Sequence, residues 1–143
     1  MTKIGYTTGV FDLFHVGHLN ILKKAKEQCD YLIVGVTTDE EVERVKSKRP
    51  FIPFEERAEI VQAICYVDKV VPEENTDKLK AWEQLKYHRI FKGDDWKGTE
   101  KWKKYEEEFS KRDVEVIYFS YTKGTSSTQI RQALQLSIDQ QSQ

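Results

Sequence analysis

Long apolar runs are absent from this chain of 143 residues, and no stretch approaches the length of a transmembrane helix. The first residues, 1–7, also contain too little apolar sequence for a signal peptide. Hydrophobic residues make up 38% of the chain and charged residues 33%, which is typical of one folded domain and excludes a disordered chain. We therefore expect a cytoplasmic protein with no membrane partner.

Cysteine is scarce, and neither sign of charge is in excess. Cys29 and Cys65 are the only cysteines, and they fit no metal-ligand spacing. We expect both to be reduced thiols packed in or near the core. The net charge is −1, so no overall field attracts nucleic acid, and we expect no nucleic-acid partner. Any anion site must come from local clusters.

What the chain does have is a regular alternation of strand-like and helix-like segments. Apolar runs predict strands at 4–8, 31–36, 68–71, 89–92 and 114–119, with Pro72 ending the third. Amphipathic patterns predict helices from His18, over 40–45, from Pro53, over 76–85, over 99–111 and from Ser126. This alternation predicts a single α/β domain over residues 1–136, an open parallel sheet with helices on both faces, followed by a polar tail at 137–143.

Three finer details follow from the same patterns. The helix from Pro53 is expected to bury Ile60, Ala63, Ile64 and Val67. The helix ending near residue 85 is expected to be capped by Asn75 or Thr76. The helix over 99–111 is expected to bury a stripe formed by Trp102, Tyr105 and Phe109.

The stretch T-G-V-F-D-L-F-H-V-G-H-L-N-I-L, residues 8–22, joins the first strand to the first helix. His15 and His18 lie at the helix entrance, where free N–H groups and the helix dipole favour an anion. Imidazoles there would donate hydrogen bonds to phosphate, and Gly17 would allow a close approach to the backbone. The same pattern also fits ordinary structural histidines or a zinc site, but His88 is the only further histidine.

Three more segments carry polar groups, and two of them, 93–96 and 122–128, follow predicted strands. Residues 122–128, T-K-G-T-S-S-T, would form a second phosphate cradle at a helix entrance or a plain helix cap. The basic segment 46–50 would close over an anionic substrate or be an ordinary solvated loop. Gly93-Asp94-Asp95-Trp96 would bind a ribose hydroxyl, a base amino group or a metal-bound water, or would be a capped turn. Because carboxyl ends of parallel strands share one edge, we expect these segments to meet there.

Together, G-V-F-D-L-F-H-V-G-H, G-D-D-W and T-K-G-T-S-S-T resemble the motifs of the small bacterial cytidylyltransferase family, in particular its members that use glycerol-3-phosphate. They also resemble the catalytic domain of choline-phosphate cytidylyltransferases. The resemblance runs from Ile4 to about Leu134 and implies a Rossmann-like nucleotidyltransferase fold. It implies that CTP and a small phosphate monoester give a CDP-alcohol, a precursor of a cell-envelope polymer, and pyrophosphate. It further implies Mg²⁺, bound mainly through the nucleotide phosphates with no protein ligand assigned, direct in-line attack and a homodimer.

The same resemblance implies roles for individual residues. His15, His18 and Lys46 are the expected catalytic residues, and Lys46, Arg57 and Lys78 are expected to bind the acceptor. Asp12 is also expected to organise the turn. The expected nucleotide-binding residues are Val10, Phe11, Asp12, Gly17, Lys48, Asp95, Tyr121, Thr122, Lys123, Gly124, Thr125, Ser126, Ser127 and Thr128.

The chain departs from the family pattern at several positions. Tyr121 and Cys65 stand where the family has arginines, and Thr76 and Leu79 replace a tryptophan and a lysine. These changes fall where acceptor specificity is expected. Glycerol-3-phosphate is the first prediction for the acceptor, followed by ribitol, ethanolamine and choline phosphates. A second hypothesis is an adenylyltransferase that uses ATP, and a third is a nucleotide-binding module without catalysis.

Overall fold

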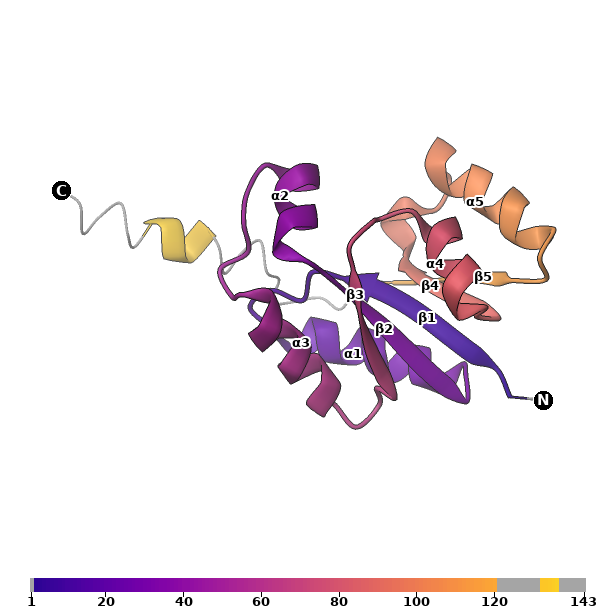
Figure 1. Cartoon of the computed structure of the whole chain (residues 1–143), viewed down its shortest axis with the longest axis horizontal. Coiled ribbons are helices and arrows are strands. Elements are labelled where there is room, and N and C mark those ends of the chain that lie inside the picture. The colour runs from indigo at the N-terminus through magenta and orange to yellow at the C-terminus, as the bar shows by residue number, and fades with distance from the viewer. Residues whose placement is uncertain (1, 121–131, 137–143) are drawn as a thin grey trace.

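The computed structural model describes residues 2–120 and 132–136 and contains one sheet of five parallel strands in the order β3-β2-β1-β4-β5 (Figure 1). The strand order reverses beside β1, which has β2 on one side and β4 on the other. This confirms the predicted single-domain α/β fold with a parallel sheet, and it puts the topological switch point between β1 and β4. The strands are β1 (Ile4–Gly9), β2 (Tyr31–Thr37), β3 (Lys69–Glu73), β4 (Arg89–Gly93) and β5 (Glu115–Phe119).

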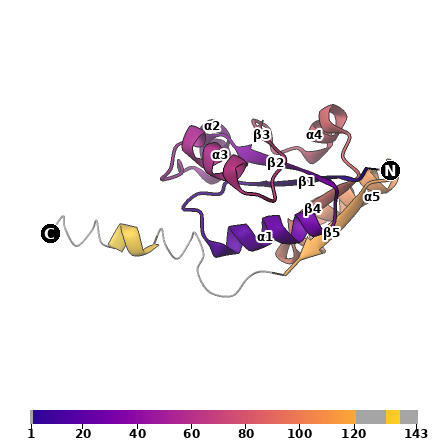
Figure 2. The same cartoon turned by 90° about the horizontal axis from the view of Figure 1, so that it is seen from below.

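Helices cover both faces of the sheet. The first face is covered by α1 (Val16–Glu27) and α3 (Phe54–Ala63), and the second by α4 (Lys78–Leu85) and α5 (Glu100–Ser110). The short helix α2 (Asp39–Lys46) follows the carboxyl end of β2. Figure 2 shows α1 running back along β1 in the opposite direction, as a parallel crossover requires. The amino-terminal end of α1 therefore lies at the carboxyl edge of the sheet.

Each face of the sheet has its own apolar core, and β2 contributes to both. Leu32, Val34 and Val36 face α1 and α3, whereas Ile33 faces the other side, as the period of a strand requires. The predicted stripe of α5 is confirmed, because Trp102, Tyr105 and Phe109 are all buried against the second face. Burial of these aromatic side chains fixes α5 against β4 and β5 and so fixes the position of the residues between them.

The predicted apolar face of α3 is confirmed only in part: Val67 is buried and Ile64 packs against the core, both just beyond the end of α3, whereas Ala63 is exposed. Ile60 is 44% exposed, whereas Arg57 and Val61, one turn apart, are almost fully buried. The apolar pattern of the sequence does not predict the buried face of α3, because one of the two buried residues on that face is an arginine. Cys65 is likewise exposed rather than packed in the core, while Cys29 is partly buried.

Two element boundaries also differ from the sequence prediction. Pro72 lies inside β3, paired in register with Val36, and does not end the strand. Proline is tolerated there because β3 is an edge strand of the described sheet, so the missing N–H costs no ladder bond on its open side. The cap of α4 is Asp77, whose carboxylate accepts a hydrogen bond from Leu79 N at 3.0 Å, and not Asn75 or Thr76.

In residues 2–120 and 132–136, no helix combines the length and the apolar character needed to cross a bilayer. The predicted tail 137–143 and most of the segment that follows β5 lie outside the described residues.

Candidate active site

The turn between β1 and α1 has a strained backbone that a buried carboxylate holds in place. Phe11 and Leu13 both adopt left-handed conformations, with φ of 53° and 52°, which cost a non-glycine residue about 1–2 kcal/mol each. Between them, the buried Asp12 accepts hydrogen bonds from Phe51 N and Ile52 N, both at 2.9 Å. Asp12 therefore ties the turn to the α2–α3 connection.

The two histidines close the first turn of α1 together. His15 is the N-cap residue, and its Nδ1 accepts a hydrogen bond from Gly17 N at 3.0 Å. In return, His15 N donates to His18 Nδ1 at 3.2 Å. This is the reciprocal arrangement of a capping box, with imidazoles in place of the usual hydroxyl and carboxylate. The helix therefore begins at Val16, two residues before the predicted start.

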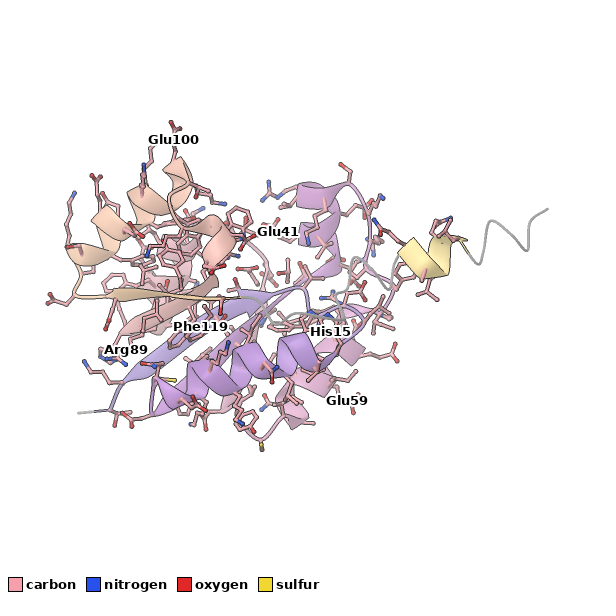
Figure 3. All side chains as sticks on the ribbon, turned by 180° about the vertical axis from the view of Figure 1, so that it is seen from behind. His15, Glu41, Glu59, Arg89, Glu100 and Phe119 are labelled. Carbon is pink, nitrogen blue, oxygen red and sulfur yellow. The ribbon has the colours of Figure 1, made fainter. Side chains whose placement is uncertain are left out.

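These hydrogen bonds also fix the state of both rings. Since each Nδ1 accepts a hydrogen bond, the proton of each neutral ring is on Nε2. Burial, and secondarily His15, lowers the pKa of His18 to about 4, although Asp12 acts in the opposite direction. Burial also lowers the pKa of His15. At neutral pH the pair is a neutral double donor whose two rings stack at 4.0 Å, and Figure 3 shows His15 beside the first turn of α1.

A cavity of about 400 Å³, here called the large cavity, lies at the same edge of the sheet. The ends of β1, β2, β3 and β4 contribute to its wall, together with α2 and α5. Its charged residues are four lysines and two carboxylates. They are Lys46, Lys78, Lys92, Lys101, Glu73 and Asp95.

A smaller cavity of about 110 Å³, here called the small cavity, lies on the α1 side of β4. Ile21 of α1, one turn after His18, lines it together with Gly93 and the end of β5 at Phe119. The small cavity is therefore next to the helix that carries the histidines. The two cavities meet at three residues that line both: Thr8, Lys92 and Trp96.

A buried ion pair forms part of the large cavity. Lys78 Nζ lies 2.6 Å from Glu73 Oε2, and Thr37 Oγ1 donates to Glu73 Oε1 at 2.7 Å. Both charged side chains are almost fully buried. Lys78, predicted to bind the acceptor, thus lines the cavity with an ammonium group that is already neutralised by Glu73.

Arg57 has a structural role, which corrects the prediction that it binds substrate. Its side chain is 1% exposed, and its guanidinium donates to the carbonyls of Ile52, Val10 and Thr37 at 2.7–2.8 Å. The same group pairs with Asp39 at 2.6 Å. Arg57 therefore joins the ends of β1 and β2 to the start of α2, and it is not among the residues that line either cavity.

The other predicted residues divide into three groups. Val10, Lys46 and Asp95 line the large cavity, and Lys46 is the last residue of α2 instead of part of a loop. Phe11 is a core residue, Gly17 is buried beside the histidines, and the exposed Lys48 is not among the residues that line either cavity. The predicted phosphate cradle, residues 122–128, and the preceding Tyr121 lie outside the described residues.

Several residues of the site were missed from the sequence. Glu73 and Lys92 each lie at the end of a parallel strand, a position that could have singled them out. Lys101 and Trp102 reach the cavity from a helix, and only the packing of α5 reveals this. The zinc hypothesis finds no support in residues 2–120 and 132–136, which contain no group of three side chains able to hold a metal.

Comparison with known proteins shows which family this sequence matches. The sequence profile of the cytidylyltransferase-like family matches residues 6–133. The glycerol-3-phosphate cytidylyltransferase of Bacillus subtilis is 38% identical over 135 residues, covering 90% of this chain and 94% of that protein. That of Bacillus spizizenii is 41% identical, covering 87% and 92%. A lipopolysaccharide core biosynthesis protein from Thermoplasma volcanium superposes with a TM-score of 0.72 at 26% identity, covering 87% of this chain and 100% of that protein.

Proposed function

The chain belongs to the cytidylyltransferase-like family, and we propose that it transfers CMP from CTP to glycerol-3-phosphate, giving CDP-glycerol and pyrophosphate. The observation that carries this proposal is the neutral histidine pair at the start of α1, at the sheet edge where the large cavity and Asp95 also lie. A ligand with several phosphates suits that edge because the helix dipole, the imidazole Nε2–H donors and the lysines all favour negative charge.

In this reaction the histidines act as hydrogen-bond donors. Because Nδ1 of each ring is engaged by the backbone, Nε2–H of His15 and of His18 is the donor that would face the triphosphate. Donors held in place before the reaction stabilise charge that grows on the oxygens of the α-phosphoryl group. Neither ring needs to gain or lose a proton, so the pair is not an acid–base catalyst.

We also propose that Mg²⁺ accompanies the nucleotide, where it would neutralise phosphate charge. Mg²⁺ commonly binds through substrate phosphates with few protein ligands. The chain itself would supply the two imidazoles and the lysines of the large cavity.

The large cavity favours an acceptor without a cationic group. A quaternary ammonium would need an open aromatic face. In this cavity an ammonium of the protein already lies over the indoles, since Lys92 Nζ is 4.8 Å from the centre of the Trp96 ring and 5.8 Å from that of Trp102. Choline phosphate is therefore disfavoured, whereas a polyol phosphate such as glycerol-3-phosphate fits the excess of lysines.

A panel of substrates tests the proposal. The protein is mixed with Mg²⁺, either CTP or ATP, and glycerol, ribitol, ethanolamine or choline phosphate, and released pyrophosphate is measured. We expect the highest kcat/KM with CTP and glycerol-3-phosphate. Pyrophosphate release with ATP but not with CTP would show an adenylyltransferase. CTP binding without turnover of any acceptor would show a non-catalytic module.

Assembly and location are further parts of the proposal. The resemblance to glycerol-3-phosphate cytidylyltransferases supports a homodimer, which sedimentation velocity at micromolar concentration would test. A cytoplasmic location would give the protein access to CTP, and the CDP-glycerol formed there would serve as an activated precursor of a cell-envelope polymer. Cell fractionation with an antibody against the chain would test the location.

A further inference from the structure

Lys92 lies at the boundary between the two cavities. It precedes Gly93 at the end of β4, the strand beside the switch point, and it lines both the large and the small cavity. The other residues that line both cavities are Thr8 and Trp96, so Lys92 is the only charged residue among the three. A cation at this junction would lie next to a group that is transferred between ligands bound in the two cavities.

The surroundings of Lys92 keep its ammonium near the two indoles. Its side chain is half-buried, and Nζ lies over the rings of Trp96 and Trp102. In residues 2–120 and 132–136 its ammonium forms no ion pair with a carboxylate, and Glu73, which lines the same cavity, is paired with Lys78.

Burial, and secondarily Lys78, lowers the pKa of Lys92 to about 8. Lys101 acts in the same direction, whereas the negative charges of Glu73 and Asp95 raise this pKa. Lys92 is thus largely charged at neutral pH but incompletely neutralised by the protein. An anionic ligand would supply the negative charge that the surrounding protein does not provide.

The charge balance of the large cavity gives the charge of that ligand. Four lysines face two carboxylates, so the wall has a formal surplus of two positive charges. A phosphate monoester has a charge of about −1.5 to −2 at pH 7. The cavity volume of about 400 Å³ is ample for a small polyol phosphate.

We propose that Lys92 is a catalytic residue that binds the phosphate of the acceptor at the junction of the two cavities. This inference rests on the proposed cytidylyl transfer and assigns the acceptor to the large cavity and the nucleotide to the α1 side. Lys92 holds the attacking phosphate against the α-phosphoryl group and offsets the repulsion between the two anions.

The step itself balances without a proton transfer from the protein. An oxygen of the acceptor phosphate, already deprotonated, forms a bond to the α-phosphorus of CTP. The bond between that phosphorus and the oxygen bridging to the β-phosphate breaks, and pyrophosphate leaves with the electron pair. The charge of the two reactants equals that of the two products, and Lys92 remains protonated throughout.

Two variants and a matched control test this role. Lys92→Met removes the charge but keeps much of the apolar stem, and Lys92→Arg keeps the charge. Lys103→Met is the control, because it deletes the same charge from an exposed position of α5 that lines neither cavity. For each protein, kcat, KM for acceptor, Kd for CTP and Tm are measured.

We expect Lys92→Met to raise KM for glycerol-3-phosphate and lower kcat, each by about tenfold, while Kd for CTP changes by less than about threefold. Lys92→Arg should recover part of kcat/KM, and Lys103→Met should match the wild type. In the wild type, acceptor binding should weaken as the pH rises through about 8, where Lys92 loses its proton, and Lys92→Arg should shift this limb to higher pH.

Three results would overturn the inference. Unchanged acceptor kinetics in Lys92→Met would show that Lys92 does not contact the acceptor, and a selective loss of CTP affinity would assign it to the nucleotide. If Lys92→Met does not fold, the pH dependence of Lys92→Arg decides instead. If acceptor binding to Lys92→Arg weakens over the same pH range as in the wild type, Lys92 does not bind the acceptor. Failure of the wild type to transfer CMP to any acceptor is a different result, because it refutes the proposed function itself.

Discussion

His18 has two roles that a pair of substitutions should separate. His18→Ala removes the acceptor of the 3.2 Å bond from His15 N and the ring that packs 5.5 Å from Phe11 and 5.2 Å from Phe14. His18→Gln keeps an acceptor at the third position of the helix, as in ordinary capping boxes. Both variants remove the imidazole Nε2–H.

The expected free energies of unfolding follow from these contacts. Loss of one hydrogen bond costs about 1 kcal/mol, and loss of the ring packing adds about as much, so His18→Ala should be less stable by about 2 kcal/mol. His18→Gln should lose less than about 1 kcal/mol, because only the packing changes. Urea unfolding at pH 7.5, followed by circular dichroism, measures both values.

Activity should follow a different pattern. Alanine has no donor to the α-phosphoryl group, and the flexible amide of glutamine does not hold its N–H groups in the place of the imidazole Nε2–H. We therefore expect kcat to fall by about 100-fold or more in both variants, which corresponds to about 2.7 kcal/mol of transition-state stabilisation. Pyrophosphate release at saturating CTP measures kcat. The reasoning fails if His18→Gln retains near wild-type kcat, or if the two variants lose stability equally.

Three further predictions concern ionisable side chains inside the fold. Arg57→Met should destabilise the fold by about 3–5 kcal/mol in urea unfolding, because Asp39 and three carbonyls lose their partner, and a loss under about 1 kcal/mol would contradict the structural role. Glu73→Gln should cost about 3 kcal/mol by leaving the Lys78 ammonium buried without its carboxylate, and the double variant with Lys78→Met should recover part of that loss. Acid should weaken the fold as the pH falls from about 6.5, where unfolded histidine takes up a proton, to about 4, the folded pKa of His18, and equal urea midpoints at pH 7.5 and 5 would contradict this.

The fold was largely predictable from the sequence because periodicity reports burial. The run 31–36 is buried along almost its whole length, and the stripe of α5 is buried as expected. The errors have local physical causes. An edge position tolerates Pro72 inside a strand, and a histidine, which ordinary capping preferences do not include, caps α1.

The site was predictable only in part. Motifs at strand ends single out the histidines and Asp95, and the basic segment 46–50 with the family resemblance singles out Lys46. Arg57 was misassigned because sequence does not distinguish a cation that binds substrate from one that joins backbone carbonyls. Lys92 was missed because its importance depends on which two cavities meet at it, and that is a property of the packed chain.

The most direct test of the central claim follows the phosphorus atoms themselves. CTP, glycerol-3-phosphate and Mg²⁺ are incubated with the protein, and ³¹P NMR identifies every product. We predict CDP-glycerol and pyrophosphate in equal amounts, with none formed when glycerol-3-phosphate is omitted. CMP or inorganic phosphate in place of CDP-glycerol, or no reaction while the protein is folded, would contradict the claim.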